Sequence, residues 1–131
     1  MTRDEILNMP AGYEMNKLIA ELVFGMKLEK NHGLAGGFYW VGNGVQFGDV
    51  RAQHVPDYSG DMNVAWSVIE KLERHLDEIL FKITRLGATM EKLRWMAEFR
   101  ECRGRQKYHV SEADTAPLAI CRAALLAMVT A

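Results

Sequence analysis

The feature that most constrains this chain is a change in the spacing of its apolar residues from a helical period to a strand period and back. Between residues 61 and 75, apolar side chains recur every three or four positions, as in an amphipathic helix. They then alternate, as in Ile79, Phe81 and Ile83, which is typical of a strand with one buried face. Residues 116–129 return to the helical pattern. The second half therefore predicts the order αβββα and an α/β fold of the α+β kind, a small antiparallel sheet sandwiched by helices.

Three strands are predicted in this half, separated by residues that favour turns. The first turn falls in residues 86–89, and Gly104 marks the second. Residues 90–96 taken alone also fit a helix. Asp114 or Thr115 is expected to cap the last helix, which has a proline in its first turn, where a missing amide hydrogen costs little. The predicted strands are residues 79–84, 93–100 and 106–110.

The first half predicts two helices followed by a glycine-rich segment. Thr2 and Glu5 have the spacing of a capping box at a helix start. A second, amphipathic helix is expected from Tyr13, with Gly25 as its stop signal. Residues 26–58 are rich in glycine and predict loops with one hairpin. The strands of that hairpin are expected at residues 38–41 and 45–47, around an Asn-Gly turn.

Length and composition indicate one globular domain. The chain has 131 residues, 49% hydrophobic and 25% charged, and a chain of this size buries roughly two-thirds of its unfolded surface. We expect a single domain over residues 1–131 with a loop or hairpin insertion around 26–58. The 16 Lys and Arg against 17 Asp and Glu give a net charge of -1. Such a balance provides no overall field that attracts nucleic acid or an anionic membrane.

Cysteine content and hydropathy predict a cytoplasmic protein. The two cysteines, Cys102 and Cys121, are too few for a disulfide scaffold. The N-terminus has charged residues and a helix start where a signal peptide would have a basic and then an apolar region. The most apolar stretch, residues 116–129, is shorter than the about 20 residues that span a bilayer, and Arg122 interrupts it. We expect no membrane segment.

No catalytic, metal or cofactor motif stands out. The four histidines are scattered, with no pair at a metal-binding spacing. Cys102 lies between Arg100 and Arg103, which favour its thiolate, but no base is near it in the sequence. The glycines of residues 33–48 match neither common phosphate-binding loop. The expectation is a protein that is not an enzyme and that has no metal or cofactor.

Aromatic residues in and beside the glycine-rich segment form the first half of a candidate ligand site. Large aromatic side chains on loops often stack on a planar ligand, although packing against the sheet is their more common role. Arg51 lies between them in the sequence and is suited to contact a phosphate or a base. The candidate aromatic residues are Phe38, Tyr39, Trp40 and Tyr58.

Basic residues around the turn at Gly104 form the second half of the candidate site. Residues 92–107 contain six basic side chains and two glutamates. Converging guanidinium groups bind phosphate in a bidentate manner, whereas a plain solvated sheet face is the commoner arrangement. The anion contacts expected besides Arg51 are Arg100, Arg103 and Lys107.

The αβββα order also occurs in double-stranded-RNA-binding domains, which grip phosphates from the start of their last helix. Here that start, residues 111–117, has two acidic residues and no lysine, so it repels a phosphate backbone. We therefore expect no nucleic acid binding. The two helix starts near Asp61 and Asp114 offer free amides to an anion, although both carboxylates oppose it.

Three stretches of the sequence are distinctive: the opening MTRDEILNMPAG, the turn PDYSGD leading into AWSVIEKL, and the ending EADTAPLAICRAALL. Together they resemble the phage ABA-sandwich domain family, small proteins of bacteriophages and prophages. The resemblance implies helices that cover a small antiparallel sheet. It implies no catalytic residue, and capping accounts for part of these stretches.

These observations lead to one expected function and one alternative. The first is a non-enzymatic phage accessory protein that binds and sequesters a small nucleotide-type ligand, such as a host immune signal. It is expected to act as a homo-oligomer in the cytoplasm of the infected bacterium, because an oligomer covers exposed aromatic surface. The alternative is a module that binds a host or phage protein through the same aromatic residues.

Overall fold

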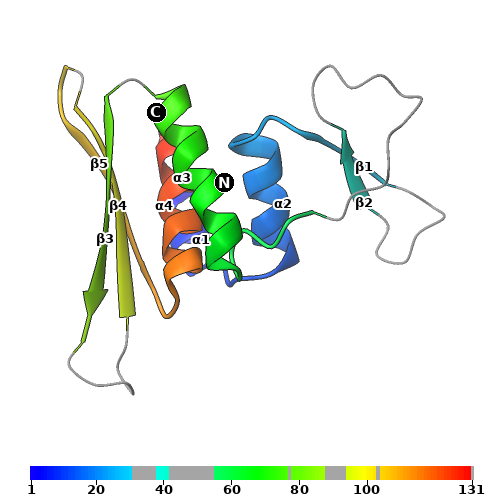
Figure 1. The fold of residues 1–131 in the computed structure, drawn as a ribbon, viewed down its shortest axis with the longest axis horizontal. Helices are drawn as coiled ribbons and strands as arrows, with labels where there is room; N and C mark the ends of the chain where they lie inside the picture. Colours follow the sequence, from blue (N-terminus) through cyan, green and yellow to red (C-terminus); the bar gives the residue numbers. More distant parts are fainter. Residues whose placement is uncertain (31–37, 42–54, 77, 88–93, 103, 131) are drawn as a thin grey trace.

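The computed structural model describes residues 1–30, 38–41, 55–76, 78–87, 94–102 and 104–130. Figure 1 shows a small sheet at one end of the molecule, a group of helices beside it, and a short strand pair at the other end. The elements in chain order are α1 (Arg3–Asn8), α2 (Tyr13–Leu22), β1 (Lys27–Lys30), β2 (Phe38–Val41), α3 (Met62–His75), β3 (Ile79–Leu86), β4 (Arg94–Glu101), β5 (Lys107–Ala113) and α4 (Ala116–Thr130).

The sheet of the second half is antiparallel, with the strand order β3-β4-β5. Its register places Phe81 opposite Phe99 and Phe99 opposite His109. These three side chains lie on the inner face, which packs against the helices, and the rings of Phe81 and Phe99 are 5.0 Å apart. The fold predicted from the sequence, a small antiparallel sheet packed against helices with the order αβββα, is confirmed.

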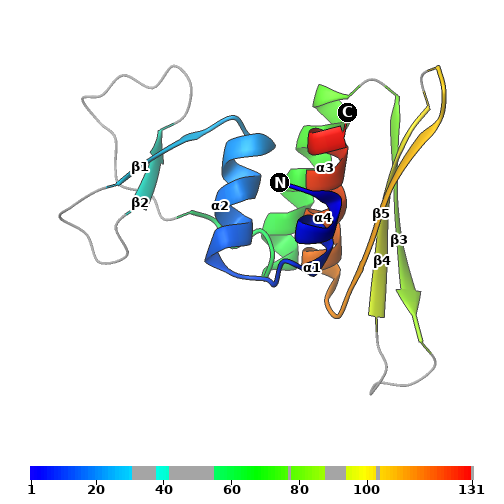
Figure 2. The same ribbon diagram turned by 180° about the vertical axis from the view of Figure 1, so that it is seen from behind.

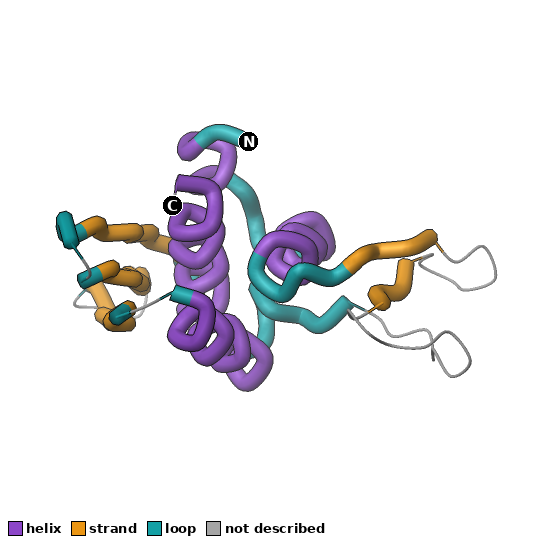
Figure 3. The backbone as a smooth tube through the Cα atoms, turned by 90° about the horizontal axis from the view of Figure 1, so that it is seen from above, coloured by secondary structure: helices purple, strands orange, loops and turns teal. Residues whose placement is uncertain are grey.

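Helix α4 is the centre of the molecule. It packs against β4 and β5 on one side and against α1, α2 and α3 on the others, and the described helices all lie on one side of the sheet (Figure 3). A helix that is apolar around most of its circumference has to be buried in this way. Cys121 and every residue from Ala123 to Leu126 have no exposed surface. None of the described helices combines the length and apolarity that a membrane crossing requires.

Local signals set the ends of the helices as predicted. The Thr2 hydroxyl accepts from the Glu5 amide at 3.2 Å, and the Glu5 carboxylate accepts from the Thr2 amide at 2.8 Å. The cap of α3 is Asp61, whose carboxylate accepts from the amide of Asn63. Gly25 follows α2 with a φ of 66°, a conformation that favours glycine.

β3 continues to Leu86, two residues beyond its predicted end, and two other strands differ more from the prediction. β5 continues to Ala113, beyond the expected end at residue 110, because Ser111 and Ala113 pair with β4 opposite Ala97 and Trp95. The predicted strand over residues 38–41 exists as β2, but its partner in the structure is β1, which the sequence did not predict. The expected second strand of that hairpin, residues 45–47, lies outside the described residues.

Candidate functional site

The candidate aromatic and basic residues do not come together within one chain. β2, which carries Phe38, Tyr39 and Trp40, lies at the end of the molecule opposite the β3-β4-β5 sheet, with α2, α3 and α4 between them (Figure 2). Arg51 and Arg103 lie outside the described residues. A single site built from all of these residues therefore needs more than one chain.

Tyr58 is a core residue, which corrects its expected place on a ligand-binding loop. Only 3% of its surface is exposed, and its ring stacks on Phe24 with the centroids 5.1 Å apart. Burial, with a smaller contribution from the charge of Cys121, raises the pKa of the Tyr58 phenol to about 12. Its ring is thus unavailable to stack on a ligand, because apolar neighbours already occupy its faces.

Arg100 and Lys107 belong to opposite faces of the sheet. Arg100 pairs with Tyr108 in the register, one position away from the Glu101–Lys107 pair, and neighbouring positions of a strand point to opposite faces. Arg100 is also engaged: its guanidinium lies 3.8 Å from the Glu98 carboxylate and 4.8 Å from the centre of the Tyr108 ring. The predicted convergence of these basic residues on one phosphate is therefore not seen in the described part of the chain.

The distinctive PDYSGD turn is explained by a buried hydrogen-bond network. The Ser59 amide and hydroxyl both donate to the Asn16 carbonyl oxygen, at 2.8 and 2.6 Å. The Asn16 side-chain amide donates to the Asp57 carboxylate at 3.0 Å, and the Ser59 hydroxyl accepts from the Gly12 amide at 3.0 Å. Ser59 has no exposed surface and Asn16 only 6%. These polar residues therefore fasten the turn before α3 onto α2.

The same turn requires glycine at position 60. A Cβ on Gly60 would collide with the Asp57 carboxylate, whose Cγ would be 2.8 Å away. Asp57 is held in that place by Asn16. The resemblance to a phage family thus rests partly on residues whose role is structural.

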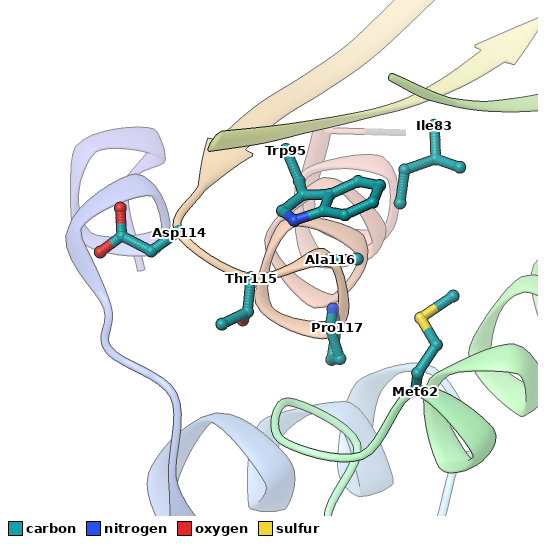
Figure 4. A pocket seen from close by; sticks show the side chains of 7 residues that line it. All are labelled: Met62, Ile83, Trp95, Asp114, Thr115, Ala116 and Pro117. Carbon is teal, nitrogen blue, oxygen red and sulfur yellow. The ribbon is translucent and has the colours of Figure 1, made fainter. Parts of the chain in front are cut away.

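Among the described residues, a cavity lies where α3 and α4 begin. It has a volume of about 470 Å³ and opens between the inner face of the sheet and the starts of α3 and α4. Figure 4 shows the Trp95 indole and Ile83 on the sheet side, Met62 on the α3 side, and Pro117 at the start of α4. The residues that line it are Met62, Ile83, Trp95, Asp114, Thr115, Ala116 and Pro117.

This pocket favours a flat, largely apolar group. Its wall is mostly hydrocarbon, together with the Trp95 indole, and the Asp114 side chain at its rim is directed away from that ring (Figure 4). Pro117 has no amide hydrogen to offer an anion. From the sequence, the two helix starts offer free amides to an anion. The structure brings both helix starts to one pocket, but that pocket is apolar.

Among the described basic residues, Arg85 is paired in the sheet register with the pocket residue Trp95. It lies directly opposite Trp95 in the register and shares the inner face with Ile83. Its side chain is exposed. Neither Trp95 nor Arg85 was predicted as a site residue, because Trp95 fits an ordinary alternating strand. The sequence feature that could have indicated Arg85 is a single arginine among the apolar inner-face positions of β3.

A buried histidine–carboxylate pair lies elsewhere on the inner face. The His109 Nε2 is 2.8 Å from a Glu101 carboxylate oxygen, and only 5% of His109 is exposed. The two residues come from neighbouring strands, β5 and β4. Within the described ranges, histidine, cysteine and acidic side chains do not gather into a group that could hold a metal ion. The pair is best understood as a buried donor and acceptor that satisfy each other.

Comparison with known proteins identifies a family. The model of the Phage ABA sandwich domain matches residues 17–125, which is most of the chain. The matched range includes the pocket and the turn before α3, whereas Asn16, which binds that turn, lies just outside it. No curated protein and no solved structure matches.

Proposed function

This chain belongs to the Phage ABA sandwich domain family, and from that premise we propose that it is a non-enzymatic phage accessory protein that binds a small nucleotide-type ligand. The observation that carries the proposal is the pocket of about 470 Å³ beside Trp95. A volume of this order accommodates a small organic ligand, and sites for such ligands are mostly apolar with a few polar groups.

The pocket and its surroundings offer separate places for the two parts of a nucleotide. A base stacks on the Trp95 indole, since an aromatic face is sequence-tolerant and worth about 1–3 kcal/mol per stacked base. The phosphate then contacts Arg85, which stands opposite Trp95 on the same face. Among the pocket residues the polar side chains are Asp114, Thr115 and Trp95, which contain no nucleophile paired with a base, in keeping with binding rather than catalysis.

In a phage-infected bacterium such binding would remove a nucleotide from solution. We propose that the ligand is a signalling nucleotide of host immunity and that the protein acts in the host cytoplasm by sequestering it. Sequestration requires affinity and no turnover, so a stacking pocket with one phosphate contact is sufficient chemistry. Phe38, Tyr39 and Trp40 of β2 are not among the residues of this pocket.

The test is a thermal-shift screen against cyclic dinucleotides, cyclic trinucleotides, cyclic ADP-ribose isomers and the simple nucleoside monophosphates. A ligand at about 100 times its dissociation constant adds about 2.7 kcal/mol to the free energy of unfolding, which raises the melting temperature by several degrees. Titration calorimetry then measures the affinity of the compound that gives the largest shift.

Matched variants locate the site. Arg85→Ala should weaken binding about 10-fold or more, because it removes a charge-assisted contact with phosphate. Lys82→Ala is the control, since Lys82 is also exposed on the same strand but lies on the outer face. If the two variants bind alike, the site is not beside Trp95. If no compound in the panel shifts the melting temperature, the nucleotide proposal is wrong and the protein-partner alternative is favoured.

A further inference from the structure

Among the described strands, β3 is an edge of the sheet along its whole length, Ile79–Leu86. The Glu78 carbonyl accepts from the Cys102 amide at 3.0 Å, so the amide of Ile79, on the other side of that peptide bond, points away from β4. Because the pattern alternates along an antiparallel strand, the backbone groups of Phe81 and Ile83 also point away from β4. An edge strand whose backbone groups point away from its own sheet is a template for another strand.

Exposed apolar side chains flank this edge on both faces. Leu80, on the outer face, is 58% exposed, the largest value among the large apolar residues described, and Trp66 on α3 is 49% exposed. Met62 and Trp66 are one helical turn apart and so share a flank of α3. Met62 and Ile83 of β3 line the same pocket, so Trp66 continues along the flank of α3 that begins at this pocket.

The side chains of β3 are complementary to those of a second β3 that runs in the opposite direction. With Ile83 opposite its own copy, the exposed Leu80 meets Leu86, and Lys82 meets the uncharged Thr84. Arg85 meets Phe81, so no two like charges are opposed. With Lys82 at the centre instead, two lysines would face each other, which is unfavourable.

We propose that two copies of this chain associate through their β3 edges, antiparallel and centred on Ile83, into one continuous sheet. A two-fold axis through Ile83 makes the contact self-complementary and closed, the commonest arrangement for soluble homo-oligomers. Because Ile83 also lines the pocket, the two pockets come to lie on either side of this axis. The inference does not depend on what the pocket binds.

The first experiment measures the dissociation constant of the full chain by sedimentation velocity over a range of concentrations. Thr84→Lys sets the introduced lysine against Lys82 of the other copy at two symmetric places, so the dissociation constant should rise about 10-fold. Adding Lys82→Glu to Thr84→Lys makes both pairs opposite in charge and should restore the affinity. Circular dichroism confirms that each variant is folded.

A second pair of variants keeps the test informative if Thr84→Lys fails to fold. Leu80→Ser changes a side chain that is already exposed and should weaken the dimer, whereas Tyr108→Ser, 48% exposed on the same face but on β5, should leave it intact. A chain that stays monomeric at several hundred micromolar overturns the proposal. A dimer that is equally affected by Leu80→Ser and Tyr108→Ser, or that Lys82→Glu fails to rescue in the Thr84→Lys variant, forms through another surface and overturns it as well.

Discussion

Asn16 shows how one side chain can join parts of the chain that are distant in sequence. Its carbonyl oxygen accepts from the Ser59 amide and hydroxyl, and its side-chain amide donates to Asp57. From the sequence, Asn16 was one of the polar residues between the apolar positions of an amphipathic helix. It is buried because the turn before α3 folds over it, and that neighbour is more than 40 residues away in the chain.

Replacement of Asn16 tests this network. Asn16→Ala should lower the free energy of unfolding by about 2–3 kcal/mol, because it leaves the buried Ser59 amide without its acceptor and removes the shorter hydrogen bond of the Ser59 hydroxyl. The exposed Asn8, whose side chain donates to the Asp4 carbonyl, provides the control. Asn8→Ala should cost less than about 1 kcal/mol. Urea unfolding monitored by circular dichroism measures both, and equal losses would contradict a special role for Asn16.

At the scale of elements, local signals set the starts of the helices, whereas long-range pairing set the end of a strand. The capping box of α1 and the cap of α3 depend on residues three or fewer positions apart, and both were predictable. The end of β5 was not, because Ser111, Glu112 and Ala113 resemble a helix cap in sequence. In the structure, β4 offers them partners, and the ladder of hydrogen bonds extends the strand.

Arg122 on α4 connects this helix to the end of α1 and to β5. Its guanidinium donates to the Met9 carbonyl after α1, at 3.0 and 2.8 Å, and to the Glu112 carbonyl of β5 at 3.0 Å. Burial lowers the pKa of Arg122 from its ordinary value, yet three hydrogen bonds offset the cost of its partial desolvation. In the sequence this residue was only an interruption of an apolar stretch.

Arg122→Met keeps the length and apolar stem of the side chain but removes its donors. We expect a loss of about 2–3 kcal/mol in the free energy of unfolding, because hydrogen bonds to a charged donor are worth more than neutral ones. Arg74→Met on the exposed side of α3 is the control and should change the stability by less than about 0.5 kcal/mol. Comparable losses for the two variants would show that Arg122 contributes no more than a surface residue.

At the scale of the whole molecule, one core connects both halves of the chain. Tyr58, from the turn before α3, is buried next to Phe24 after α2, and the charge of Cys121 on α4 influences its pKa. Burial raises the pKa of the Tyr58 phenol from 10.0 to about 12, and it also raises the pKa of the Cys121 thiol. Both groups hold their protons more tightly in the folded protein than in the unfolded chain.

This arrangement predicts a loss of stability in alkali. As the pH rises above about 9 to 10, the unfolded chain releases these protons first, so the stability present at lower pH is lost as the pH approaches the folded values. Tyr58→Phe removes the phenol, and its stability should fall less steeply than that of the native protein between pH 10 and 12, by up to about 1.4 kcal/mol per pH unit. Urea unfolding at pH 7, 9, 10 and 11 provides the comparison. Parallel curves for the two proteins would mean that Tyr58 does not titrate with folding.

The candidate site was predicted less well than the fold, for a reason that lies in the whole molecule. Aromatic and basic residues were grouped because each set was dense in the sequence. The structure separates β2 from β4 and β5 by a layer of helices (Figure 2). The pocket instead combines Met62, Trp95 and Pro117, which come from α3, β4 and α4 and are not close in sequence.

The sequence by itself determined the periods, caps and turns of this protein, and through them the αβββα order and the inward-facing residues of the sheet. These properties depend on interactions between residues within a few positions of one another, so the pattern of side chains carries them directly. The tertiary structure alone decided that Asn16 and Tyr58 are buried, that two helix starts and Trp95 line one pocket, and that β3 is an edge strand among the strands described. These properties depend on which distant segments meet, and that is set by the packing of all the apolar faces around α4 at once.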